Sequence, residues 1–181
     1  MGGFPARSHV ISGLSVMSPL HLSIVDVRAE ELEANNSENK GGSWAGENGP
    51  VLHFVEGIPG FPSARHFVVV PLPPDLEPFC RIRCLDVSGL EFVVVPPGLL
   101  FDNYKVEVED EEVERLGLTT EEDAVVLVIV TLARLPAVPT VNLLGPLVIN
   151  KHTMTAAQVI QHTSGYGVSV PIPMSSVESA L

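Results

Sequence analysis

The stretch Ala124-Val-Val-Leu-Val-Ile-Val-Thr131 gives the clearest structural signal in this chain of 181 residues. Its apolar run continues to Ala133 with only Thr131 as a break, and it is rich in Val and Ile, which favour β-strands. The run has the length of a strand and falls well short of the ~20 residues that a membrane-spanning helix needs. We therefore expect a β-strand here and no membrane span.

Similar short apolar runs lie on both sides of this stretch, and several alternate between apolar and polar residues with the period of a strand. Sixteen prolines and fifteen glycines separate the runs and argue against long helices. The other expected strands are Leu20–Val27, Val51–Val55, His66–Val70, Phe79–Cys84, Leu90–Val95, Tyr104–Val108, Val141–Ile149 and Gln158–Gln161. This spacing predicts a mostly β fold: a single small antiparallel β-barrel or sandwich-like domain with one or two short helices.

One short helix is expected after Tyr104–Val108. Asp110 suits its N-cap, the acids that follow suit the positive end of the helix dipole, and Gly117 suits its C-terminal end. Thr119 and Glu122 have the spacing of a capping box, which predicts a second, single turn before the strand at Ala124.

The domain boundaries follow from composition. Residues 1–17 lack a pattern and are expected to be a disordered or mis-started tail, with 18–173 as the β domain and 174–181 as a disordered C-terminal tail. Residues 34–50 are polar and glycine-rich, so we expect a flexible insertion there, with Trp44 in its middle.

The net charge of −12 restricts the partners of this protein. An acidic surface repels phosphate groups, which argues against direct binding to nucleic acid or to an anionic membrane and is compatible with a basic protein partner. No apolar stretch of secretory length follows the N-terminus, so we expect a cytoplasmic protein. Cys80 and Cys84 share one face of a strand about 13 Å apart, too far for a disulfide, and are expected to be buried, inert thiols.

No catalytic, cofactor or metal site is expected from the sequence. The six histidines show no ligand-like spacing, and the many carboxylates do not form an evident catalytic pair. His53 and His66 flank one turn and could meet, which keeps open the alternative of a small β-barrel hydrolase.

The sharpest charge feature is the stretch Asp102–Asp123, which holds ten acidic and two basic residues, a net charge of −8. One interpretation is a solvated helix with its flanks, and the other is a docking face for a basic partner. The residues expected to form that face are Glu107, Glu109, Asp110, Glu111 and Glu112.

From Val51 onward the order of motifs resembles the FliW family. Val51–Phe61 is similar to the opening strand and the Gly-x-Pro-Gly-Phe turn of that family, and Thr140–Asn150 is similar to its Thr-x-Asn-Leu-x-x-Pro-(Ile/Leu)-Val-Ile-Asn run. Other similar runs are His66–Leu72, Pro78–Asp86, Leu90–Pro96, Asp102–Val108, Glu121–Thr131 and Gln158–Ile160. Within these motifs, Gly57 and Gly60 are expected to permit turn geometry, and Asn142 and Asn150 to satisfy turn backbone groups.

The chain departs from the family pattern in three places. A long insertion separates Leu20–Val27 from Val51, and Gly145 stands where the family usually has alanine. The ending Val168–Pro173 differs from the usual basic close of the family.

The resemblance implies a single β-rich domain, expected to be a monomer, without cofactor or catalytic residues. It implies two protein partners: flagellin, which the protein would bind as a chaperone, and a CsrA-like RNA-binding repressor, which it would antagonise. We expect the acidic residues to meet the repressor, and apolar turns around Ile58 and Phe61 to meet flagellin. The alternatives are a flagellin chaperone without a repressor partner and the hydrolase.

Overall fold

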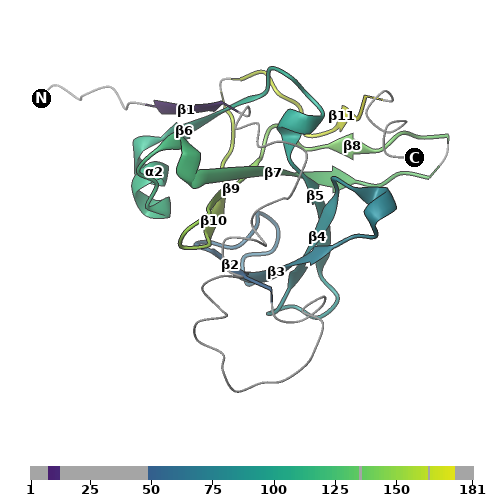
Figure 1. Ribbon diagram of the computed structural model, residues 1–181, viewed down its shortest axis with the longest axis horizontal. Coiled ribbons are helices and arrows are strands. Elements are labelled where there is room, and N and C mark those ends of the chain that lie inside the picture. Colours follow the sequence, from purple (N-terminus) through teal and green to yellow (C-terminus); the bar gives the residue numbers. More distant parts are fainter. Residues whose placement is uncertain (1–7, 13–48, 135, 163, 174–181) are drawn as a thin grey trace, which may run out of the picture.

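The computed structural model describes residues 8–12, 49–134, 136–162 and 164–173 (Figure 1). The expected strand Leu20–Val27, Trp44, nearly all of the expected insertion and the expected C-terminal tail lie outside the described residues. Among the described residues, no helix has both the length and the apolar character that crossing a membrane requires.

The fold is a closed β-barrel with short extensions. The strands are β1 (Ser8–Ser12), β2 (Val51–Phe54), β3 (His66–Pro71), β4 (Cys80–Cys84), β5 (Glu91–Val95), β6 (Lys105–Glu109), β7 (Ala124–Thr131), β8 (Thr140–Val141), β9 (Leu147–Asn150), β10 (Thr155–Gln158) and β11 (Val170–Pro171). The helical elements are α2 (Asp110–Leu116) and the 3-10 turns η1 (Pro74–Leu76), η2 (Pro97–Leu99) and η3 (Glu121–Asp123). The mostly β prediction is confirmed.

Strand β7 closes the barrel, because it pairs with β5 along one part of its length and with β9 along another. The ring runs β7-β5-β4-β3-β2-β10-β9 and back to β7, with β8 and β11 added beyond β7. Every pairing in the ring is antiparallel except that of β10 with β2, which is parallel. A closed ring of seven strands cannot alternate direction throughout, so one parallel pair is required.

The two faces of β7 explain why its sequence is apolar throughout. Leu127 packs inside the barrel in a cluster with Phe54, Phe67 and Ile82. Val128 and Val130 belong to a second cluster, which also holds buried residues of β1 and β6. A strand covered on both faces loses the alternation that a half-exposed strand shows.

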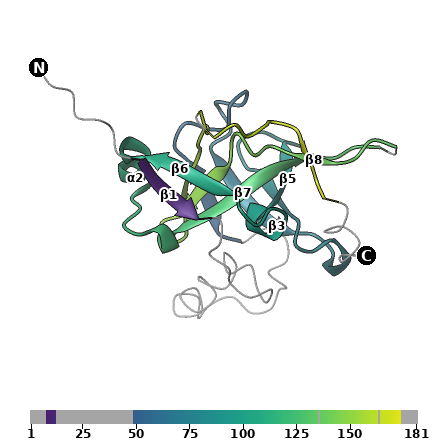
Figure 2. The ribbon, with the colours of Figure 1, turned by 90° about the horizontal axis from the view of Figure 1, so that it is seen from above.

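β1 and β6 form a two-stranded ribbon on the outside of the barrel, next to α2 (Figure 2). The second cluster includes buried residues of this ribbon, of α2 and of β7. β1 pairs antiparallel with β6 along its whole length, and Ile11 is buried. The prediction that residues 1–17 form a featureless tail is therefore wrong for Ser8–Ser12. A five-residue strand in which Ile11 is the one buried residue among His9, Val10 and Ile11 gives too weak a pattern to predict from sequence.

Four local predictions also need correction. The expected strand Val141–Ile149 is split into β8 and β9, since Gly145 and Pro146 interrupt it. The strand expected at Gln158–Gln161 lies instead at Thr155–Gln158. The N-cap of α2 is Glu109 and not Asp110, although Gly117 does end the helix, with φ of 66°. The capping box is shifted by one residue and joins Thr120 to Asp123.

Candidate functional site

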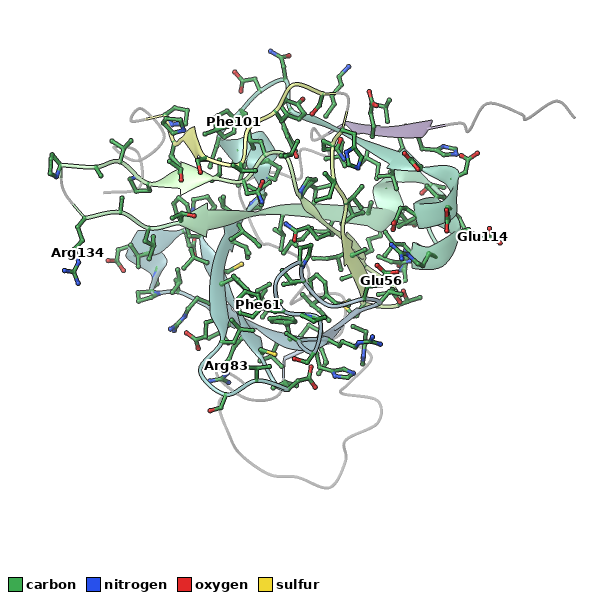
Figure 3. The ribbon with its side chains drawn as sticks, turned by 180° about the vertical axis from the view of Figure 1, so that it is seen from behind. Glu56, Phe61, Arg83, Phe101, Glu114 and Arg134 are labelled. Atoms are coloured by element: carbon green, nitrogen blue, oxygen red, sulfur yellow. The ribbon has the colours of Figure 1, made fainter. Side chains whose placement is uncertain are left out.

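The residues of the expected acidic docking face lie on β6 and α2, and most of them are exposed. In β6, Val106 and Val108 point into the core, and the alternate residues therefore point outward. In α2, Leu116 is buried, which turns the acidic side of the helix to solvent. We define the acidic surface as the exposed carboxylates Glu107, Glu109, Asp110, Glu111 and Glu114. Figure 3 shows Glu114 projecting from the helix away from the barrel.

Asn150 fixes α2 to the barrel. Its side-chain Nδ2 donates to the carbonyl groups of Leu116 (3.0 Å) and Gly117 (2.9 Å), at the end of the helix. Its Oδ1 accepts from the backbone N–H groups of His152 and Thr153. The amide is buried and fully paired, so it holds the C-terminal end of α2 against the turn after β9. The expectation that Asn150 satisfies turn backbone groups is confirmed.

One acidic residue of the predicted face is turned inward to an ion pair. Glu112 binds the guanidinium of Arg115 within the helix, and Arg115 Nη1 also lies 2.6 Å from Oε1 of Glu56. These carboxylates raise the pKa of Arg115, and the hydrogen bond that Arg115 donates to Glu112 is the largest cause. Asp110 lies 3.2 Å from His9 of β1, and both side chains are more than half exposed. Glu112 therefore serves the protein's own structure and is not part of the acidic surface.

The turn after β2 borders this surface. Gly57 and Gly60 have φ of 79° and 90°, as the turn prediction requires. Within the turn, Ile58 pairs with Phe61 in an isolated antiparallel β-bridge. Ile58 is buried in the barrel cluster, which corrects its assignment as a partner contact. Phe61 is 40% exposed and packs edge-on against Phe92, with ring centroids 5.7 Å apart. Phe61 alone of this pair remains a candidate contact.

A pocket of about 280 Å³ lies between this turn, α2 and β10. Its walls include Ile58, Pro59 and Pro62 from the turn, with Arg115 from the helix and Gln158 from β10. Arg115 already binds two carboxylates, so it offers no free charge to an anionic ligand. The pocket therefore joins the turn to the helix, with Glu56, Arg115 and Gln158 as its polar lining.

Gly145 makes room for the pocket-lining amide of Gln158. The Nε2 of Gln158 donates to the Gly145 carbonyl across 2.7 Å, and the Gly145 N–H donates to Oδ1 of Asn142, as expected for this asparagine. A Cβ at position 145 would lie 2.7 Å from Nε2 of Gln158. The side chain of Gln158 can therefore occupy this position only because residue 145, where the chain departs from the family pattern, is a glycine.

His53 and His66 do meet, as the hydrolase alternative requires. They are register partners on β2 and β3, with ring centroids 5.1 Å apart, and His66 Nδ1 lies 2.9 Å from Oδ1 of Asp86. The hydrogen bonds from the His66 side chain and from the backbone N–H groups of His66 and Arg65 lower the pKa of Asp86 to about 2. The described residues hold no group of three or more His, Cys, Asp or Glu side chains placed for a metal ion.

The two cysteines of β4 are both buried and free. Burial raises the pKa of Cys80 to about 11, because an apolar environment disfavours the thiolate. This agrees with the expectation of unreactive thiols.

The sequence did not predict that Arg115, Glu56 and Gln158 would lie together in one region. Arg115 and Glu56 lie 59 positions apart, and neither stands in a pattern that pairs them. β10 pairs with β2 and also contacts α2, so it lies between the strand that leads into the turn and the helix.

Taken together, the fold is a small closed β-barrel that carries a charged helix and a tight glycine-proline turn on its outside. The FliW protein family model matches residues 35–172. A flagellar assembly factor FliW of Bacillus subtilis (strain 168) is 35% identical over 122 residues, which cover 67% of this chain and 85% of that protein. A flagellar assembly factor FliW of Clostridium novyi (strain NT) is 33% identical over 122 residues, covering 67% of this chain and 85% of that protein.

The fold agrees with these sequence matches. A crystal structure of the flagellar assembly factor FliW superposes with a TM-score of 0.63 at 32% identity, covering 68% of this chain and 86% of that chain. The chain belongs to the FliW family.

Proposed function

We propose that this protein is a cytoplasmic, monomeric flagellar assembly factor that acts by binding other proteins and not by catalysis. It binds flagellin as a chaperone and antagonises a CsrA-like RNA-binding repressor. The observation that carries the proposal is the acidic surface on β6 and α2, presented on a closed barrel within a FliW-family chain. The names of the related proteins support the role in flagellar assembly.

The acidic surface suits the repressor because an RNA-binding protein must be basic where it meets phosphate groups. Its carboxylates are exposed, so they attract a basic protein over a distance and accelerate the encounter more than they tighten the final complex. The barrel behind them keeps the helix rigid, and Asn150 ties the helix to that barrel.

Flagellin needs a different, more apolar contact, since a newly made subunit exposes its assembly segments. Phe61 and Leu99 are large apolar side chains that are 40% and 50% exposed. Phe61 lies on the turn beside the pocket, and Leu99 lies on η2, which follows the barrel strand β5. Neither residue belongs to the acidic surface, so the two partners use chemically distinct contacts.

Charge reversal tests the repressor contact. Glu111 and Glu114 are exposed one helical turn apart, and the double variant Glu111→Lys, Glu114→Lys should slow association with the repressor by about tenfold at low salt. The matched control is Asp75→Lys, Glu77→Lys, which changes the net charge equally on exposed residues around η1. Stopped-flow or surface-binding kinetics at two salt concentrations measure both variants. Equal association rates for the two variants would refute the acidic surface as the docking face.

Titration of the repressor complex with flagellin tests the two-partner proposal. The chain is small, and each partner would cover ~800 Å² of it, so flagellin should release the repressor, with reciprocal effects on the two affinities. A ternary complex with both affinities unchanged would refute the antagonism. Binding of flagellin with no binding of the repressor would favour the chaperone without a repressor partner.

A further inference from the structure

The side chains of His53 and His66 lie on the outer face of the barrel, and the proposed function uses neither of them. They are direct register partners across the antiparallel pair of β2 and β3. Side chains opposite each other in such a pair project together from the same face of the sheet, with Cβ atoms about 4.5–5.5 Å apart. The backbone therefore holds two imidazole rings side by side without any loop that must first become ordered.

The spacing of the rings matches that of two ligands of one metal ion. An imidazole nitrogen binds Zn²⁺ at about 2.0–2.1 Å, which places the ring centre about 3.2 Å from the metal. Two ring centres 5.1 Å apart then subtend about 105° at the metal, close to the tetrahedral angle. The rings meet edge-on at 88°, and binding of one ion by both would require rotation of the exposed His53 side chain while Asp86 holds His66.

Asp86 prepares His66 for this role. Its Oδ1 lies 2.9 Å from Nδ1 of His66, and its Oδ2 accepts the backbone N–H groups of Arg65 and His66 at 2.7 Å each. An ionised carboxylate can only accept, so Nδ1 of His66 is the donor in this contact. In the neutral imidazole Nε2 then carries the lone pair, and a carboxylate behind a histidine is the usual outer partner of a metal-binding imidazole.

Both rings are accessible to an ion from solvent. His53 is exposed, and the side chain of His66 is 44% exposed. Among the described residues no third His, Cys, Asp or Glu completes a larger ligand group. Water would fill the remaining positions, and binding would be weaker than at a closed site with four protein ligands.

We propose that His53 and His66 form a two-imidazole site for a divalent transition-metal ion of the zinc, copper or nickel class, with Asp86 orienting His66. The ion would link β2 to β3 across the sheet. Imidazole nitrogen favours these metals, and hard ions such as Mg²⁺ prefer oxygen ligands. The site lies apart from the acidic surface, so this proposal stands independently of the proposed function.

The test is titration of the full chain, without an affinity tag, with ZnCl₂ in a calorimeter. The parent should bind one Zn²⁺ at this site, and His53→Gln or His66→Gln should each weaken that binding at least about tenfold. The matched control is His152→Gln, because His152 also pairs with an aspartate, Asp123, at 3.1 Å but has no imidazole opposite it. His152→Gln should bind Zn²⁺ as the parent does.

Thermal unfolding gives a second measurement. A ligand that binds only the folded state raises the melting temperature, so Zn²⁺ should raise it for the parent and for His152→Gln, but not for His53→Gln. Mg²⁺ should have no such effect. The proposal is overturned if the His53 and His66 variants bind Zn²⁺ like the parent, if His152→Gln loses binding equally, or if the parent does not bind it.

Asp86→Asn tests the orienting role separately. It should weaken Zn²⁺ binding by about 10–100-fold, since loss of the outer carboxylate removes the acceptor that fixes the ring. Unchanged affinity in a folded Asp86→Asn variant would refute that part of the proposal.

Discussion

Arg115 Nη1 donates to Oε1 of Glu56 across 2.6 Å, and this contact joins the acidic helix to the turn after β2. The same guanidinium binds Glu112 in its own helix, so one cation holds two carboxylates from different elements. The side chain of Arg115 is 28% exposed and lines the pocket between them. The turn and the helix that carries part of the acidic surface are therefore linked by this side chain.

Arg115→Met removes the charge and keeps most of the apolar stem. We expect it to lower the free energy of unfolding by about 1 kcal/mol, because a partly exposed ion pair contributes modestly and two carboxylates lose their cation. Chemical denaturation measures the change. Arg134→Met is the matched control: Arg134 is exposed on the hairpin between β7 and β8, far from Glu56 in Figure 3, and should change stability by less than about 0.5 kcal/mol.

Asn150→Ala removes a buried amide with four hydrogen bonds to backbone groups. The carbonyl groups of Leu116 and Gly117 would lose their partner, and we expect a loss of about 2–4 kcal/mol in the free energy of unfolding. Hydrogen exchange should also show faster opening of α2 than of the barrel strands. Asn103→Ala, at an exposed position, should change neither measurement; equal effects of the two variants would contradict the anchoring role.

Two glycines of one turn should respond differently to alanine. Gly57→Ala combines a φ of 79° with a Cβ that would lie 2.8 Å from the carbonyl oxygens of Phe61 and Pro62. Gly60 has a φ of 90°, but a Cβ there would meet nothing within 4 Å. We expect Gly60→Ala to cost about 1–2 kcal/mol from backbone strain alone, and Gly57→Ala clearly more. Equal melting temperatures for the two variants would contradict the crowding at Gly57.

The sequence predicted the barrel strands well where apolar runs were bounded by Gly, Pro or charged residues, as at Val51–Phe54 and Ala124–Thr131. The short spacing of adjacent apolar runs and their alternation with a period of two residues were sufficient to predict a small antiparallel barrel or sandwich. The closure of β10 on β2 in parallel could not be predicted, because it follows from the number of strands in the ring and not from any local pattern.

The candidate site was predicted in part. Alternation along β6 correctly placed Glu107 and Glu109 outside, since Val106 and Val108 had to be inside. The inward turn of Glu112 and the burial of Ile58 were missed, because both depend on contacts between elements distant in sequence. The sequence analysis gave the contact between His53 and His66 only as a possibility. The register of β2 against β3 determines which residues lie opposite each other, and that register depends on the turn between the strands.

Gly145→Ala should disturb Gln158, whose Nε2 would lie 2.7 Å from the new Cβ. The amide would have to move and lose its 2.7 Å bond to the Gly145 carbonyl, so we expect a loss of about 1 kcal/mol. In Gly145→Ala, Gln158→Ala the clash is absent, and the combined loss should be smaller than the sum of the two single losses. A double-mutant cycle by denaturation measures this coupling; strict additivity would contradict it.

Ile11→Ala tests whether β1 is part of the folded domain. Ile11 is 5% exposed and packs in the cluster that also holds Val106, Val108 and Leu116. Truncation of a buried isoleucine should lower the free energy of unfolding by about 2–4 kcal/mol, because the lost apolar contacts leave a cavity under the ribbon. Val10→Ala is the matched control, since Val10 lies on the same strand but is 39% exposed, and it should cost less than about 1 kcal/mol. If Ile11→Ala were as stable as the parent, β1 would contribute nothing to the core, and the N-terminal segment would be dispensable for stability after all.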